Sequence, residues 1–113
     1  MGEPATAQLD TIEAQACSCG STRRAFVDAR PGTASVHLLD VRDAATHYHR
    51  TATELYIVLD GEGTVELDGT AHPARALSAF LIPPGCRHRA VGDLRMLVVA
   101  IPAADDKDEF FDD

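Results

Sequence analysis

The sequence lacks a long hydrophobic run. Its longest uninterrupted apolar stretch extends from Met96 to Ile101, whereas a membrane-spanning helix needs about 18 apolar residues. The N-terminus also lacks the basic start and the apolar stretch of a secretory signal, because Glu3, Asp10 and Glu13 lie there instead. We therefore expect a soluble, cytoplasmic protein with no membrane partner.

Basic patches are absent as well. The chain has 10 lysine and arginine residues against 18 aspartate and glutamate residues, for a net charge of −8. Nucleic acids and anionic membranes require basic surfaces, so we expect no partner of either kind. Much of the acidic charge lies in residues 103–113, which we expect to form a solvated, disordered tail. Phe110 and Phe111 leave open that the tail docks on the body of the protein or on a partner.

Cysteines are few and odd in number: Cys17, Cys19 and Cys86. Without a secretory signal, such a set favours reduced thiols in a cytoplasm. The alternative, a soft-metal site shared by all three, requires a spacing that differs from the usual zinc motifs. We therefore expect Cys17 and Cys19 to be thiols in a tight loop before Gly20.

The chain has the texture of an all-β protein from Arg23 onward, because short runs of strand-forming residues alternate with turn signals. The predicted strands cover residues 25–28, 35–41, 47–50, 54–59, 64–68, 79–82, 87–91 and 95–101. This number of strands suits one jelly-roll or barrel domain. We predict an N-terminal arm over 1–22, with a possible short helix, a barrel over 23–102 and the acidic tail over 103–113.

A pair of histidines, His47 and His49, is one residue apart. In an extended strand both side chains project to the same face, so they can chelate one ion. Glu54 lies at the start of the next predicted strand, and His88 follows a Pro-Pro-Gly turn on a later strand. Together these residues predict one divalent transition metal per chain, because imidazole and carboxylate suit Fe(II), Mn, Ni, Co or Zn.

These residues give the sequence a resemblance to the cupins. The first cupin motif, G-x5-H-x-H-x3-4-E-x6-G, is matched at His47, His49, Glu54 and Gly61, and the second, G-x5-P-x-G-x2-H-x3-N, at Pro83, Gly85 and His88. Val41 and Leu77 replace the leading glycines, and Gly92 replaces the final asparagine. The resemblance implies a double-stranded β-helix of the small single-domain type, a metal site and a homodimer.

Strand alternation also predicts what lines the pocket. Tyr56 shares its strand face with Glu54, and Cys86 shares the face of His88 if that segment is extended. His37 lacks a companion donor two residues away, so we expect it to line the pocket or the dimer surface rather than bind the metal. The strands 55–59 and 96–101 are apolar on both faces, which independently favours a homodimer.

Two classes of function are compatible with this inventory. The first is a metal-dependent enzyme acting on a small molecule, either a dioxygenase or an isomerase or lyase that uses the metal as a Lewis acid. The second is a metal-assisted binding module without turnover. The sequence shows no cluster of cations for a phosphate or for two carboxylates, which favours an uncharged or singly anionic ligand.

Overall fold

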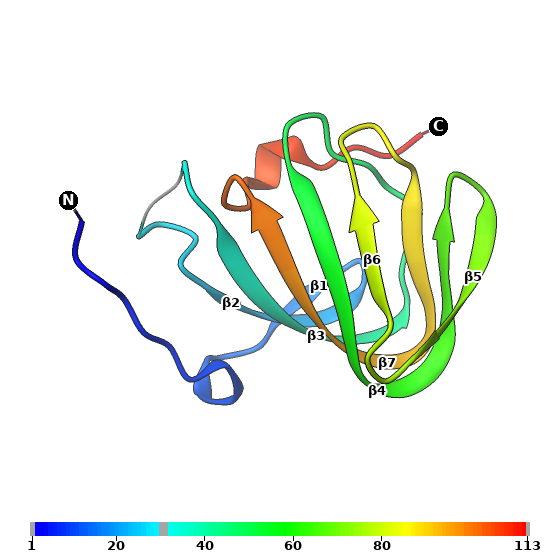
Figure 1. Cartoon of the computed structure of the whole chain (residues 1–113), viewed down its shortest axis with the longest axis horizontal. Helices are drawn as coiled ribbons and strands as arrows, with labels where there is room; N and C mark the ends of the chain where they lie inside the picture. The colour runs from blue at the N-terminus through cyan, green and yellow to red at the C-terminus, as the bar shows by residue number, and fades with distance from the viewer. Residues whose placement is uncertain (1, 30–31, 113) are drawn as a thin grey trace.

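A computed structural model describes residues 2–29 and 32–112, which fold into one curled antiparallel sheet (Figure 1). The sheet order is β1-β2-β3-β7-β4-β5, and β6 pairs with β4. The all-β jelly-roll prediction is confirmed. The strands are β1 Gln15–Cys17, β2 Gly20–Ala25, β3 Ser35–Asp43, β4 Thr53–Leu67, β5 Thr70–Arg75, β6 Ala79–Ile82 and β7 His88–Ile101, and short 3-10 turns cover η1 Leu9–Thr11 and η2 Asp106–Asp108.

Two long strands, β4 and β7, pair along most of their length and curve together in the wall of the barrel (Figure 1). Each replaces two shorter predicted strands, because the intervening glycines bend the chain without ending it. Gly61 has a φ of +94°, and a Cβ there would collide with the carbonyl oxygen of Asp93 across the pair. The register shifts between Val58 and Asp60, which adds a bulge beside this bend.

The first strands begin earlier than the sequence indicated. β1 lies wholly and β2 partly inside the segment assigned to the arm, while the predicted strand at 25–28 ends at Ala25. Phe26 has a φ of 67°, which ends the extended conformation there. In the arm, Leu9 and Ile12 belong to a single 3-10 turn and its cap rather than to an α-helix.

The core fills the inner side of the curled sheet. It is built by alternate residues of β3, β4 and β7, and its most buried members include Val58, Val65, Ile82 and Met96. The opposite, outward positions of β4 and β7 are apolar as well but only partly covered. Among the described residues, no helix is long and apolar enough to cross a membrane.

The C-terminal tail is docked on the barrel, so the expectation of a disordered tail is wrong for residues 103–112. The carboxylate of Asp108 accepts hydrogen bonds from the backbone N–H groups of Arg50, Thr51 and Ala52. Phe110 forms a β-bridge with Tyr48, and their rings stack at 5.6 Å. Residues 47–50 therefore form isolated bridges, to His88 and to the tail, rather than the predicted strand.

Candidate metal centre

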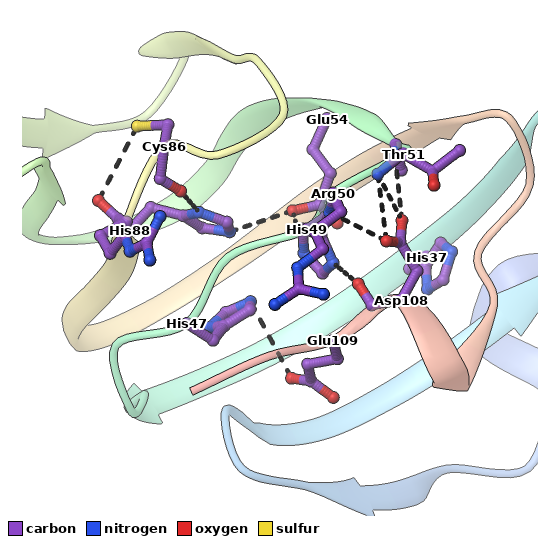
Figure 2. A network of polar contacts seen from close by, with 12 residues as sticks. His37, His47, His49, Arg50, Thr51, Glu54, Cys86, His88, Asp108 and Glu109 are labelled. Carbon is purple, nitrogen blue, oxygen red and sulfur yellow. Dashed lines mark hydrogen bonds and ion pairs between the residues drawn. The ribbon is translucent and has the colours of Figure 1, made fainter. Parts of the chain in front are cut away.

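Four side chains converge at one end of the barrel interior: those of His47, His49, Glu54 and His88 (Figure 2). His47 and His88 face each other across a backbone bridge with N–H···O distances of 3.0 and 2.9 Å. Glu54 lies near the start of β4, and His88 is the first residue of β7. One potential ligand atom from each residue lies within 4.8 Å of the other three. The structure thus brings the four predicted ligands together.

Glu54 is the centre of this group. Its Oε1 lies 3.0 Å from Nε2 of His49 and 3.1 Å from Nε2 of His88. Nε2 of His47 completes the cluster from the side of the tail, 4.0 Å from Oε1 of Glu109. The arrangement offers three imidazole nitrogens and one carboxylate to a shared point, which is a donor set for a divalent transition metal.

The orientation of each imidazole is set through its other nitrogen. Nδ1 of His47 lies 3.0 Å from the carbonyl oxygen of Ala45, that of His49 lies 2.6 Å from the oxygen of Asp108, and that of His88 lies 2.8 Å from the oxygen of Cys86. A carbonyl oxygen can only accept, so each Nδ1 carries a proton and each Nε2 is the nitrogen left to face the cluster. Anchoring of this kind is typical of metal-binding histidines.

A buried nitrogen provides a test of whether a metal fits. Nε2 of His49 is inaccessible to solvent and lacks a hydrogen-bond partner among the described residues, because its close approach to Glu54 does not have hydrogen-bond geometry. A buried polar atom without a partner is costly. A cation placed among the four ligands would satisfy it, so the residues fit a metal.

The electrostatics of the four-residue cluster also favour a bound cation. Burial opposes ionisation of Glu54, but its contacts with His49 and His88 outweigh burial and hold its pKa well below its usual range. Burial also opposes protonation of His49, yet the contact with Glu54 prevails and raises the pKa of His49 to about 9. Burial and the neighbouring His88 lower the pKa of His47 to about 4. The site thus holds a carboxylate anion that attracts positive charge.

A cavity of about 390 Å³ opens beside the cluster. Tyr56 lines it, as the alternation of its strand predicts, and so does His37, for which the dimer surface was the alternative. His37 lies outside the four-residue cluster, and its Nε2 is 2.8 Å from Oγ of Ser35. Cys86 does not line the cavity, contrary to expectation: it precedes β7, so strand alternation does not reach it, and it packs against the core.

Sequence reasoning missed the other walls of the cavity. Thr22 and Arg24 line it from β2, and Glu109 lines it from the tail. Alternation along β2 places Thr22 and Arg24 on one face, but that strand was predicted to start too late to show it. Asp108 anchors His49 through its backbone carbonyl from a distant segment. The spacing of the motifs gives no indication of this role.

Cys17 and Cys19 also line the cavity, and their sulfurs are joined in a disulfide. The expectation of reduced thiols is therefore wrong for this pair, and a metal site shared with Cys86 is excluded by the bond. Cys17 ends β1 and Cys19 lies in the two-residue turn before β2, which holds their side chains together. Cys86 is a free thiol.

Known proteins match this chain in fold. A family model for the cupin domain matches residues 31–101. A protein from Planctomyces limnophilus of known crystal structure is 41% identical, with 96% of this chain and 97% of that chain covered and a TM-score of 0.91. No curated protein matches the chain in sequence.

Two more distant structures share the fold at lower identity. Pac13, described as a unique nucleoside dehydratase, is 20% identical, with 97% and 95% of the two chains covered and a TM-score of 0.79; a Streptomyces Pac13 variant has been solved with uridine. Ectoine synthase from P. lautus is 17% identical, with 88% and 78% covered and a TM-score of 0.72. Because the model of the cupin domain matches most of the barrel, the chain belongs to the cupin family.

Proposed function

We propose that this cupin is a metal-dependent enzyme, a lyase or isomerase, that acts on a small hydroxylated molecule in the barrel cavity. The observation that carries the proposal is the convergence of three Nδ1-anchored histidines and Glu54 beside a cavity of about 390 Å³. That volume lies in the range of small-molecule sites, roughly 300–1,000 Å³.

His47, His49, Glu54 and His88 would hold one divalent ion, for which Fe(II), Mn, Ni, Co and Zn remain candidates. Such an ion supplies Lewis acidity toward a hydroxyl or carbonyl oxygen of the bound molecule. The cavity reaches three of these residues, His47, His49 and Glu54. A molecule bound in the cavity can therefore approach the ion.

Two further side chains favour lyase or isomerase chemistry over a dioxygenase, because both reactions move protons. Glu109 brings a carboxylate to 4.0 Å from His47 and lines the cavity, so it is placed to accept a proton from a bound molecule. Burial, reinforced by the Glu54 charge, raises the pKa of Tyr56, so its hydroxyl stays protonated and can donate a hydrogen bond.

The names of the similar structures lend support at the level of reaction class. Pac13 is called a nucleoside dehydratase, and dehydration is a lyase reaction. At this low sequence identity the similarity to Pac13 indicates a shared fold and not a shared substrate. Nucleosides are therefore one class of test compound among several. Dioxygenase activity and binding without turnover are the competing readings.

The test is turnover by tag-free protein loaded with each candidate metal. Hydroxy acids, sugars and nucleosides are incubated with the protein, proton NMR follows the products, and an electrode follows dissolved oxygen. We expect new olefinic or carbonyl signals that require the metal and consume no oxygen. Glu109→Gln should lower kcat by roughly a hundredfold or more, the usual contribution of a general base, and leave metal binding intact.

Other outcomes contradict the proposal in distinguishable ways. Oxygen uptake coupled to substrate loss identifies a dioxygenase. Saturable binding of a compound without conversion identifies a binding module. Equal turnover by the wild type and by Glu109→Gln removes Glu109 from the reaction while leaving the metal centre in place.

A further inference from the structure

We infer that the cavity contains a carboxylate-binding subsite, formed by Thr22 and Arg24 of β2 with His37 of β3, and that the ligand is a small hydroxy monocarboxylate. Its carboxylate would lie against this subsite and its hydroxyl would face the histidine cluster. The inference deepens the proposed function and rests on it for the hydroxyl end only. The carboxylate end stands on its own contacts.

Thr22 supplies the first observation. Its side chain lines the cavity, the residue is 9% exposed, and its Oγ1 is buried without a hydrogen-bond partner among the described residues. An unpaired buried hydroxyl costs free energy comparable to a lost hydrogen bond. A ligand oxygen in the cavity would remove this cost, because a threonine hydroxyl can donate to it.

Arg24 supplies the charge. It lies two residues along the same strand, so it shares the face of Thr22, and it also lines the cavity. Its side chain is 21% exposed, and its guanidinium already holds a carboxylate, that of Asp106, at 3.2 Å. The Asp106 side chain is 88% exposed, so this ion pair contributes little and a ligand can replace it. Asp106 thus occupies the place that the ligand carboxylate would take.

His37 completes the subsite from the neighbouring strand, where it pairs directly with Arg24. Its Nε2 lies 2.8 Å from Oγ of Ser35, and that oxygen also accepts from the N–H of Ala104. The hydroxyl proton of Ser35 is then free to go to Nε2, which leaves the proton of the imidazole on Nδ1. With the Ser35 hydroxyl donating to Nε2, Nδ1 of His37 can donate to a ligand, and His37 lines the cavity beside Arg24.

The number of charges selects the ligand class. Among the described residues that line the cavity, Arg24 is the single arginine or lysine, which suits one carboxylate rather than a phosphate or a dicarboxylate. The acidic lining residues of the tail, Asp105, Asp106 and Glu109, are exposed to solvent, where their repulsion is screened. A neutral ligand would leave the guanidinium to Asp106 and use only part of the subsite.

The experiment is an NMR titration of the intact chain with γ-hydroxybutyrate and with its neutral counterpart, γ-hydroxybutyramide. Both metal-free and zinc-loaded protein are used. We expect the acid to shift the resonances of Thr22, Arg24 and His37 in both forms, with tighter binding to the zinc form. The amide should bind at least about tenfold more weakly, since a charge-assisted hydrogen bond is lost.

Three variants sharpen the test. Arg24→Gln should weaken binding of the acid by about tenfold to a hundredfold and Thr22→Val by a few-fold, whereas Asp106→Asn should strengthen it. Arg95→Gln is the matched control, because Arg95 is an exposed arginine paired with Asp40 outside the cavity lining.

The outcomes separate this subsite from the metal centre. Equal affinity for acid and amide, or an acid affinity unchanged in Arg24→Gln, overturns the subsite even if zinc binds. Binding of the acid to metal-free protein, lost in Arg24→Gln, supports the subsite even if the protein binds no metal. Shifts confined to residues around His47 and His88 would mean that the acid only chelates the ion.

Discussion

Asp108 shows at the scale of one residue how the tail completes the site. Its backbone carbonyl anchors Nδ1 of His49, while its carboxylate holds the N–H groups of residues 50–52, the loop between His49 and Glu54 (Figure 2). The residue is 9% exposed. One residue therefore controls the spacing of two proposed ligands, although it lies far from both in sequence.

We expect Asp108→Asn to weaken metal affinity by roughly tenfold to a hundredfold, the usual effect of losing a group that orients a ligand. The amide presents one acceptor oxygen and no charge, so the loop loses part of its support. Isothermal titration with zinc measures the change, and the cobalt absorption spectrum should shift as the ligands relax. Asp112→Asn, in the same tail but paired with exposed Arg87, should change neither; equal affinities in the two variants would contradict this role.

The pH dependence of stability gives a second test at one residue. Burial, with a smaller contribution from Arg24, lowers the pKa of His37 from 6.5 to about 4. The folded state thus resists protonation, and the stability from neutral His37 is complete above pH 6.5 and is lost as the pH falls toward 4. The loss is about 3 kcal/mol at most.

The check is urea unfolding of metal-free protein across that pH range. The wild type should lose more stability on acidification than His37→Gln, which has no imidazole to protonate. Taking the difference between the two proteins cancels the other histidines. Parallel pH profiles would mean that His37 titrates near its ordinary value in the folded protein.

At the residue scale, the spacing of the histidines and Glu54 in the sequence predicted the four converging side chains. Strand alternation and the cupin motifs can both be recognised within short segments of sequence. His47, His49 and Glu54 are close in sequence, and His88 follows its own Pro-Gly turn. Asp108 and Arg24 escaped prediction because their roles depend on how the tail and the first hairpin pack over the mouth of the cavity. That packing depends on backbone N–H groups of residues 50–52 and on a partly buried disulfide, which no short pattern encodes.

The turns explain, at the scale of elements, how the chain departs from the cupin motifs. Gly92 replaces the asparagine of the second motif and has a φ of +99°, a conformation that glycine adopts readily. Leu77 replaces a motif glycine and has a φ of 73°, which a branched side chain adopts only with strain. At Leu77 the chain therefore holds a strained residue where the motif has glycine.

Leu77→Gly should therefore stabilise the protein by up to about 1 kcal/mol, since the strain of roughly 1–2 kcal/mol exceeds the added flexibility of glycine in the unfolded chain. The backbone N–H of Leu77, which donates to the carbonyl of Val58 at 2.8 Å, is unaffected by the change. Denaturant unfolding measures the difference. Leu81→Gly, in β6, is the control and should destabilise; destabilisation by both would refute the strain.

Glycines also explain why strand boundaries were predicted less well than strand positions. Turn signals at Gly61 and Gly92 indicated chain reversals, but in the structure they mark bends within β4 and β7. Glycine allows both a turn and a bulge, and the choice depends on pairing with a strand far along the chain. The sequence therefore located the strands and divided them in the wrong places.

The whole molecule presents an apolar outer face across β3, β7, β4 and β6. Val36 pairs with Val99, which pairs with Leu55, which pairs with Leu81. Leu81 is 65% exposed. Apolar patches of several hundred Å² are rare on monomers, so we propose that a second copy of the chain covers this face, in an isologous homodimer.

Light scattering at micromolar concentration tests this assembly. We expect about twice the 12.1 kDa mass of one chain, and a mass near that of one chain for Leu81→Lys, which places a charge in the face. Leu77→Lys is the control, because Leu77 is more exposed but lies at a turn outside the face. A wild-type mass of one chain, unchanged on dilution, would contradict the homodimer.

The metal content of the protein tests the central claim most directly. Tag-free protein is treated with chelator, reconstituted with each candidate ion and measured by elemental analysis beside a His47→Ala and His49→Ala double variant whose fold is verified by circular dichroism. The account predicts about one ion per chain in the wild type and almost none in the variant. A wild-type protein that holds no ion after reconstitution, or a folded double variant that holds as much as the wild type, would contradict it.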